Sequence, residues 1–244
     1  MRVDGLAIAL RPRPMAEAAD LGAALVRAHA ASVWRSFLPL YGVVVLVSLC
    51  TAEFATWLPA TLIFMLKPWL DRSLLFILSR AVFGQATRWN DLWQQRRVVW
   101  GGQLLRSLFW RRLSPWRSYT QAVEQLEGQR GSARRKRRAQ ILRGRRGAAT
   151  GLQFAFANVE MALYLAVLSI ALWFAPEGSL RNVFAWFNDS DSVPVSVLAA
   201  SAYAAVVGLL EPFYVGAGFA MYLNRRVELE AWDIEQEFRR DFAE

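Results

Sequence analysis

The stretch from Val193 to Arg226, VPVSVLAASAYAAVVGLLEPFYVGAGFAMYLNRR, decides the fold class of this chain. It is almost entirely apolar, contains one acid, Glu211, directly before Pro212, and closes on two arginines. About 20 apolar residues of helix cross a bilayer core, so the stretch is long enough to span a membrane. A carboxylate inside such a segment is costly and is usually paired or functional. We therefore expect an all-α integral membrane protein.

The overall composition supports this expectation and restricts the chemistry. The chain has 244 residues, a formal net charge of +9 and 55% hydrophobic residues, against about 45–50% in an ordinary globular chain. The single cysteine, Cys50, and the single histidine, His29, exclude an intramolecular disulfide and leave little basis for a metal site. The basic balance favours anionic partners, and the apolar stretches make lipid a better candidate than nucleic acid.

Four apolar segments predict a polytopic helical bundle within a single membrane domain. We expect the membrane spans at residues 34–54, 57–83, 151–174 and 194–223. The second span is interrupted by a proline, Pro68, which should kink it, and by several charges. Alternatively, this span ends near Leu66, and Ser73 to Phe83 lies in the membrane plane, because snorkelling makes interfacial charge inexpensive.

Amphipathic segments separate and flank the spans. Residues 14–32 are expected to lie on the membrane surface as a helix that opens at Pro14. Residues 88–128 predict short helices rich in Trp and Arg, with a break at Gly101 and Gly102; a small soluble helical subdomain is the alternative, because the same apolar stripe serves either. Residues 224–242 predict a further amphipathic helix, dominated by acids on its polar side.

Residues 129–149 carry a dense positive charge and no acid. Because basic loops stay in the cytoplasm, this segment and both termini are expected on the cytoplasmic side. The basic residues expected to contact anionic lipid are Arg134, Arg135, Lys136, Arg137, Arg138, Arg143, Arg145 and Arg146. The acidic helix at 224–242 lies on the same side, so the two could instead dock within one chain or between subunits, although exposed charge pairs are weak.

Charged side chains within the spans are expected to meet. At about 1.5 Å per residue they lie roughly 14–21 Å inside the bilayer, near its midplane. An unpaired charge at that depth costs about 2.5–3.5 kcal/mol. We expect a membrane-buried polar cluster in which Lys67 and Arg72 face Glu160 and Glu211. Its full membership is Lys67, Asp71, Arg72, Asn158, Glu160, Tyr203 and Glu211, with Asn158 and Tyr203 as donors. The cluster is interpreted as a clamp that sets helix register, as a proton or cation path through the acids, or as a headgroup or ligand site.

Four further stretches carry a resemblance to known proteins. They are EAADLG (17–22), LKPWLDRSLLFILSRAVFG (66–84), QAVEQLEG (121–128) and EPFYVGAGFAMYLNRRVELEAWDIEQEFRR (211–240). They resemble a family of uncharacterised bacterial inner-membrane proteins, distantly similar to the non-catalytic membrane domain of glycerophosphoryl diester phosphodiesterase-like proteins and often encoded near MoxR-type ATPases, von Willebrand A-domain proteins and transglutaminase-like membrane proteins. The matching positions are Glu211, Pro212, Tyr214, Tyr222, Arg225, Trp232, Asp233 and Glu235. The resemblance implies a multi-pass protein of the bacterial inner membrane and implies no reaction.

The sequence contains no catalytic triad, no glycine-rich phosphate loop and no metal-ligand spacing. We expect a protein that is not an enzyme, has no cofactor, and serves as a membrane scaffold or partner subunit, either as a homo-oligomer or with another membrane protein. A small transporter or channel that uses Glu160 and Glu211 is the alternative. A further alternative is a membrane-shaping, lipid-binding protein that uses Trp93, Trp100 and Trp110. Nucleic acid is not expected as a partner, because the basic run contains no aromatic residues.

Overall fold

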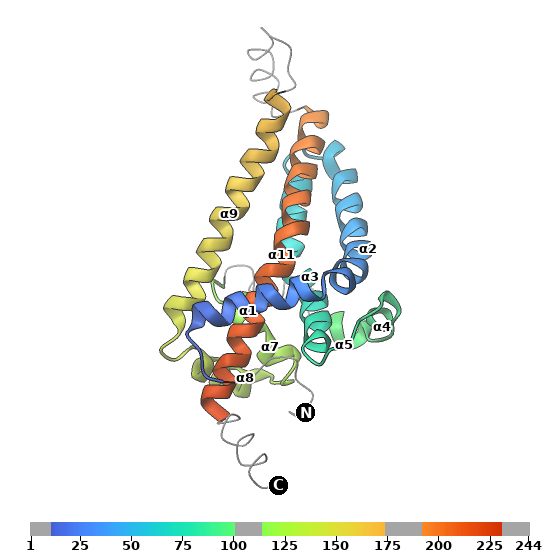
Figure 1. Ribbon diagram of the computed structural model, residues 1–244. Helices are drawn as coiled ribbons and strands as arrows, with labels where there is room; N and C mark the ends of the chain where they lie inside the picture. The colour runs from blue at the N-terminus through green and yellow to red at the C-terminus, as the bar shows by residue number, and fades with distance from the viewer. Residues whose placement is uncertain (1–10, 101–113, 174–191, 231–244) are drawn as a thin grey trace.

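A computed structural model describes residues 11–100, 114–173 and 192–230, and within these ranges every regular element is helical (Figure 1). The elements are α1 (Met15–Ala28), α2 (Ala30–Leu49), the 3-10 helix η2 (Cys50–Glu53), α3 (Leu58–Ala81), α4 (Trp89–Gln94), α5 (Arg96–Trp100), α7 (Arg117–Gln125), α8 (Gly131–Leu142), α9 (Arg146–Trp173) and α11 (Val193–Glu230). The all-helical prediction is confirmed for the described ranges. The predicted break at Gly101 and Gly102 lies outside them, as do residues 231–242.

Among the residues that the structure describes, three helical segments are long and apolar enough to cross a membrane, which indicates a membrane protein. They are Ala30–Glu53, Arg146–Ile170 and Val193–Glu230, and they correspond to the first, third and fourth expected spans. In the upper part of Figure 1, α2, α3 and α11 stand together, and α9 lies on the other side of α11 from α2. The second expected span forms α3, which is not among the three because it carries several charged residues along its length.

Helix α3 is continuous from Leu58 to Ala81 and contains Pro68. No helix boundary falls at Leu66, so the alternative of a separate helix that starts at Ser73 is wrong. From Lys67 onward nearly every side chain of α3 is buried, on all sides of the helix. A helix that is enclosed all round lies inside a protein rather than on its surface, so the second half of α3 belongs to the protein interior.

Helix α11 is the central element, and its two halves differ. It runs for 38 residues without a break, about 57 Å, whereas a bilayer core is about 30 Å thick. Before Glu211 it leaves Leu198 and Leu209 exposed, but from Glu211 to Asn224 its side chains are nearly all buried against α1, α3 and α7. The helix does not end at Asn224, where the fourth expected span closes: α11 passes through this position without a break, because no glycine or proline interrupts residues 219–230.

Glycines allow neighbouring helices to cross the lower half of α11 at close range. A Cβ atom added to Gly22 of α1 would lie 2.2 Å from the carbonyl oxygen of Gly216. A Cβ atom added to Gly218 would lie 2.3 Å from the hydroxyl of Ser118 in α7. Helix α1 therefore lies across α11 with the two backbones in contact, as Figure 1 shows. We call α1, α4, α5, α7, α8 and the part of α11 from Glu211 onward the helical base.

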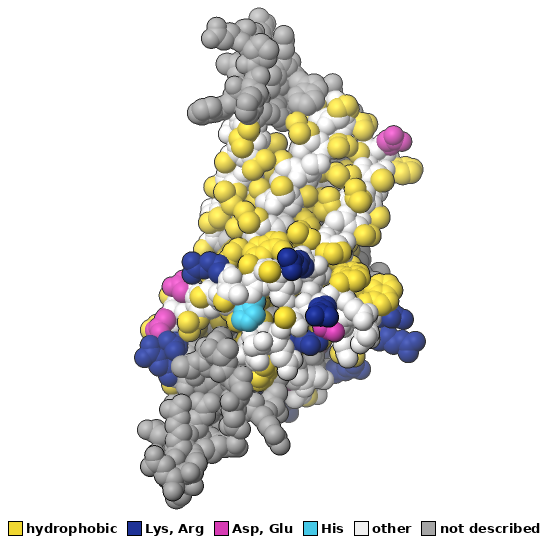
Figure 2. All heavy atoms as spheres, turned by 45° about the vertical axis from the view of Figure 1, so that its right-hand side comes forward, with side chains coloured by type: hydrophobic (Ala, Val, Ile, Leu, Met, Phe, Trp, Pro, Cys, Tyr) yellow, Lys and Arg dark blue, Asp and Glu magenta, His cyan; other side chains and the backbone are white. Residues whose placement is uncertain are grey.

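The outer surface above the base is apolar. Large exposed side chains lie on α2, α9 and α11, among them Leu46, Val47, Phe154, Leu165 and Leu198. Figure 2 shows apolar side chains across the upper part of the molecule, with most of the charged side chains in its lower half. The base is different, because the apolar stripe of α7 faces inward: Tyr119, Ala122 and Val123 are fully buried. Helix α7 is therefore a core helix, whereas Trp89 and Trp93 of α4 remain partly exposed.

Candidate functional site: a buried ion-pair network

One lysine joins three helices at the level where the upper bundle meets the base. Lys67 and Asp71 lie one turn apart on α3, so both side chains point the same way. The Nζ atom of Lys67 is 2.6 Å from Oε2 of Glu160 in α9 and 2.8 Å from Oε2 of Glu211 in α11. Lys67 and Glu211 are buried, whereas the side chain of Glu160 is 20% exposed.

Arg117 of the base binds the same acids from the other side. Its Nη2 atom is 2.6 Å from Oε1 of Glu211, its Nε atom is 2.8 Å from Oδ2 of Asp71, and its guanidinium lies over the ring of Tyr214. Burial alone would lower the pKa of Arg117, but Asp71, Tyr214 and Glu211 outweigh it and raise the pKa, so the side chain stays charged. We call Lys67, Asp71, Arg117, Glu160 and Glu211 the polar clamp; it holds two cations and three carboxylates.

A second group balances this charge. Arg72 lies 3.8 Å from Glu124, and it donates hydrogen bonds to the carbonyls of Val98 and Val99. Glu124 is also paired with Arg134 of α8. This group adds two cations and one carboxylate to the polar clamp, so the two groups together are formally neutral. Neutrality matters because a buried charge without a partner is strongly destabilising.

The structure brings together Lys67, Asp71, Glu160 and Glu211 of the predicted cluster. Tyr203 lines one cavity with Lys67 and Glu160, whereas Arg72 and Asn158 lie elsewhere. Arg72 directly follows Asp71, about 100° further round the helix, so its side chain reaches Glu124 and the α5 carbonyls instead of the predicted acids. Asn158 lies two residues before Glu160, on the opposite face of α9, where it is exposed and donates to the carbonyl of Phe154. Tyr203 packs edge-on against Tyr164, with ring centroids 5.9 Å apart.

Sequence reasoning missed Arg117, which stands in the segment expected to lie on the membrane surface. A signal for it exists in the charge balance: the predicted cluster held Lys67 and Arg72 against three acids, so one further cation was needed. The signal does not say which cation, because the chain has 29 lysines and arginines.

A cavity of about 440 Å³ lies beside the polar clamp, between α3, α9 and α11. Lys67 and Glu160 form its charged wall, and Phe64, Ala157 and Met161 supply apolar surface. Glu160 is thus the clamp carboxylate that faces open space. Within the described ranges, no group of three or more His, Cys, Asp or Glu side chains is arranged to hold a metal ion.

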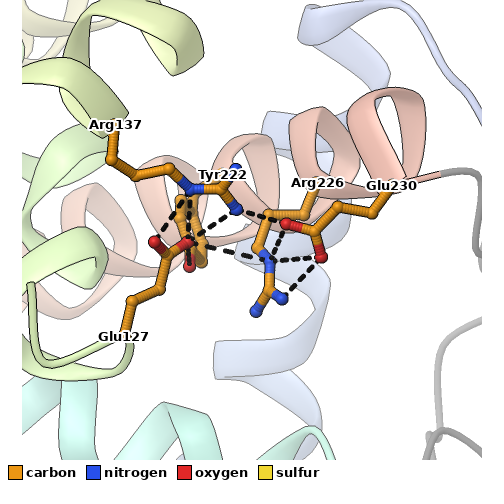
Figure 3. A network of polar contacts seen from close by, with 5 residues as sticks. All are labelled: Glu127, Arg137, Tyr222, Arg226 and Glu230. Carbon is orange, nitrogen blue, oxygen red and sulfur yellow. Dashed lines mark hydrogen bonds and ion pairs between the residues drawn. The ribbon is translucent and has the colours of Figure 1, made fainter. Parts of the chain in front are cut away.

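The basic segment forms helix α8, which is bound to the lower end of α11 (Figure 3). Arg137 donates to both carboxylate oxygens of Glu127, which also accepts a 2.6 Å hydrogen bond from Tyr222, and Arg137 reaches Glu230 as well. The hydrogen bonds that Arg137 donates to Glu127 are the largest cause of the raised pKa of Arg137. The sequence left open whether the acidic helix expected at 224–242 docks onto the basic segment within one chain. The structure shows this docking as far as Glu230.

This docking occupies several side chains that were expected to contact anionic lipid. Arg134, Arg137 and Arg145 pair with the carboxylates of Glu124, Glu127 and Glu228 respectively. Two others lie over the ring of Trp116: Arg138 and Arg146. The remaining three are exposed to solvent: Arg135, Lys136 and Arg143.

Comparison of the chain with protein-family models, with curated proteins and with solved structures gives no significant match in any of the three. The polar clamp, the neighbouring cavity and the charged junction of α8 with α11 are therefore interpreted from their own geometry.

Proposed function

We propose that the chain is a four-span protein of the bacterial inner membrane, and that it acts as a non-enzymatic scaffold that holds the helical base against the membrane. One observation carries the proposal. Glu211 binds Lys67 of the upper bundle through one oxygen and Arg117 of the base through the other. Interhelical polar contacts of this kind fix the register of membrane helices, and here they also fix the base.

The position of the bilayer follows from exposed charged residues on one side of the bundle and from contacts between helices at the same heights. Arg35 of α2 and Glu53 of η2 are exposed at the two ends of an uncharged run, about 27 Å apart at the rise of an α-helix, close to a bilayer core of about 30 Å. Trp34, next to Arg35, packs against Phe213, and Ser196 donates to the carbonyl of Thr56, close to Glu53. Phe213 and Ser196 therefore mark the inner and outer edges of the bilayer core on α11. The membrane part of α11 is then residues 196–213.

This placement moves the polar clamp from the predicted midplane to the cytoplasmic leaflet. The sequence-based depth of Glu211 was counted from Asn224, but the Asn224 side chain bonds to the backbone of Arg13 within the base. Counted from Phe213, Glu211 lies within about 3 Å of the inner edge along the helix. The second half of α3 then carries its charges into protein rather than lipid, which explains its low hydropathy and supports a fourth span.

The topology and the family resemblance support the same arrangement. The basic segment and the start of α2 lie on the base side, so the positive-inside rule assigns the base to the cytoplasm. The stretches that resemble the bacterial family supply Gly22, Lys67, Asp71, Glu124 and Glu211, which all contribute to the junction. The exposed Arg135 and Lys136 belong to α8, the helix whose Arg137 pairs with Glu230. Glu230 lies about 26 Å along α11 from the inner edge, too far for strong attraction of these side chains to lipid at a Debye length of about 8 Å. We assign them to an anionic partner protein.

The scaffold proposal is tested by replacing Lys67 with Met in the purified protein. Glu160 then loses its cation, so the free energy of unfolding in detergent should fall by about 3–5 kcal/mol. Glu53→Gln, which removes an exposed carboxylate, is the matched control and should leave stability unchanged. Equal stability of Lys67→Met and the control would contradict the proposal.

A small transporter is the second candidate, and the cavity that reaches Lys67 and Glu160 favours it. The two functions separate in proteoliposomes. A proton relay requires pH-dependent flux that Glu211→Gln abolishes while the protein stays folded, whereas a scaffold shows no flux in the parent protein.

A further inference from the structure

The cavity beside the polar clamp has the size and lining of a binding site for an amphipathic molecule. Its volume of about 440 Å³ lies in the range of small-molecule sites, about 300–1,000 Å³. Helix α9 contributes Gln153, Ala157, Glu160 and Met161 from one face, and α3 contributes Phe64 opposite them. Polar and apolar surfaces therefore meet in one space.

Glu160 is the acid best placed to attract a cation from this cavity. Asp71 and Glu211 both contact Arg117, whereas Glu160 shares the single charge of Lys67 with Glu211. Glu160 is also 20% exposed, against 3% for Glu211 and 0% for Asp71. Glu160 shares its one cation with Glu211 and is the most exposed of the three acids, so a ligand with an ammonium group would be attracted to its open side.

Gln153 supplies a neutral donor at the inner end of the cavity. Its Oε1 atom accepts a hydrogen bond from Tyr214, which leaves its Nε2 atom to donate to a ligand oxygen such as a phosphate ester. Tyr214 lies next to Phe213, at the inner edge of the proposed bilayer. From Gln153 the cavity extends along α9 to Tyr164, about 16 Å, in the direction that an acyl chain of the cytoplasmic leaflet takes.

We propose that the cavity binds one phospholipid of the cytoplasmic leaflet that carries an amine headgroup. Glu160 lies seven residues beyond Gln153 on α9, about 10 Å further into the proposed bilayer, so the headgroup turns into the cavity. Its ammonium pairs with Glu160, its phosphate accepts from Gln153, and one acyl chain lies along Ala157, Met161 and Phe64. This inference rests on the membrane placement under the proposed function. It goes beyond that proposal, because it assigns a ligand of stated chemistry to one side of the scaffold.

Native mass spectrometry of the detergent-purified protein, titrated with phosphatidylethanolamine or phosphatidylglycerol of equal chain length, tests the proposal. The parent chain should retain one phosphatidylethanolamine in preference to phosphatidylglycerol. Glu160→Gln should weaken that binding about tenfold or more, as expected for the loss of one charge-assisted hydrogen bond, and should remove the preference. Ala157→Phe fills the cavity and should abolish retention, whereas Val159→Phe, at a site 47% exposed on the same helix, should not.

Melting temperatures of all variants show whether lost binding reflects unfolding, and Ala60→Phe repeats the cavity-filling test from α3. Equal retention of both lipids by the parent chain, or normal retention by a folded Ala157→Phe variant, would overturn the inference. The inference would also be overturned if the cavity-filling variants lost a co-purifying protein and kept their bound lipid. Recovery of the parent chain in the soluble fraction would instead reject the membrane placement itself, so the two failures are distinguishable.

Discussion

At the scale of single residues, the energetics of the polar clamp depend on charge balance rather than on the number of contacts. Glu211 has two cationic partners, and its removal leaves Lys67 with Glu160 and Arg117 with Asp71. Removal of Arg117 is different, because it leaves three carboxylates with the single cation of Lys67. Within the polar clamp the cations are fewer than the carboxylates, so removal of a cation should destabilise the protein more than removal of a carboxylate.

We predict that Arg117→Met lowers the free energy of unfolding by about 3–5 kcal/mol and that Glu211→Gln lowers it by less. Chemical denaturation in detergent gives both values. Arg130→Met, which removes an exposed arginine near the same helix, is the control and should have little effect. The reverse order of the two clamp variants would show that the balance of charge does not set the stability of this site.

The network that holds α8 to α11 should be weaker, because it is more exposed. Arg137 is 20% exposed, against 4% for Arg117. We predict that Arg137→Met costs about 1 kcal/mol and that added salt reduces this cost, since exposed ion pairs are screened. Melting curves at low and high salt measure it. A cost equal to that of Arg117→Met would mean that the base depends on its surface pairs.

Part of this site was predictable from single residues. Lys67, Glu160 and Glu211 stand alone in apolar segments, and the cost of an unpaired charge in lipid almost requires that they meet. Arg72 and Asn158 were misplaced because the rotation of each helix about its axis decides which side chains face inward. This rotation depends on how the helices pack against one another, and it cannot be read from one sequence.

At the scale of elements, the crossing of α1 over α11 is the tightest contact in the fold. Gly22 and Gly216 have no room for a side chain, because each would meet backbone or a buried side chain of the other helix. The close approach lets α1 bury Met15, Ala18 and Val26 against α11.

We predict that Gly22→Ala destabilises the protein by about 1–3 kcal/mol, because an added methyl group in a filled space forces the helices apart. Gly42 of α2 has no atom within 4 Å of an added Cβ, so Gly42→Ala should be neutral or stabilise by about 0.5–1 kcal/mol. Melting temperatures of the Gly22→Ala and Gly42→Ala variants, compared with that of the parent protein, test this prediction. An unchanged Gly22→Ala variant would show that α1 is not held against α11.

The hydropathy of the sequence predicts the long helices, but it does not predict the residue at which α11 leaves the proposed bilayer. The residues from Tyr214 to Tyr222 are mostly apolar and carry no charge, which suits lipid and protein interior equally. In the structure they are covered by α1 and α7. Burial in lipid and burial in protein select the same side chains, so only the packing of the base separates them.

At the scale of the whole molecule, the proposed topology places η2 and the base on opposite sides of the membrane. In a Cys50→Ser background, a cysteine at Glu53 should react with a membrane-impermeant maleimide in intact spheroplasts. A cysteine at Lys136 should react only after lysis. Both native side chains are exposed, so differences in reactivity report sidedness. Equal labelling of the two sites before lysis would contradict the topology.

The central claim is that opposite charges from the membrane bundle and the base are energetically coupled through Glu211. A double-mutant cycle of Arg117→Met and Glu211→Gln, read as free energy of unfolding in detergent, measures that coupling directly. We predict about 1–3 kcal/mol of coupling, with the double variant more stable than Arg117→Met alone, because it removes one of the carboxylates left unpaired. Additive effects, with the double variant less stable than either single variant, would contradict the claim.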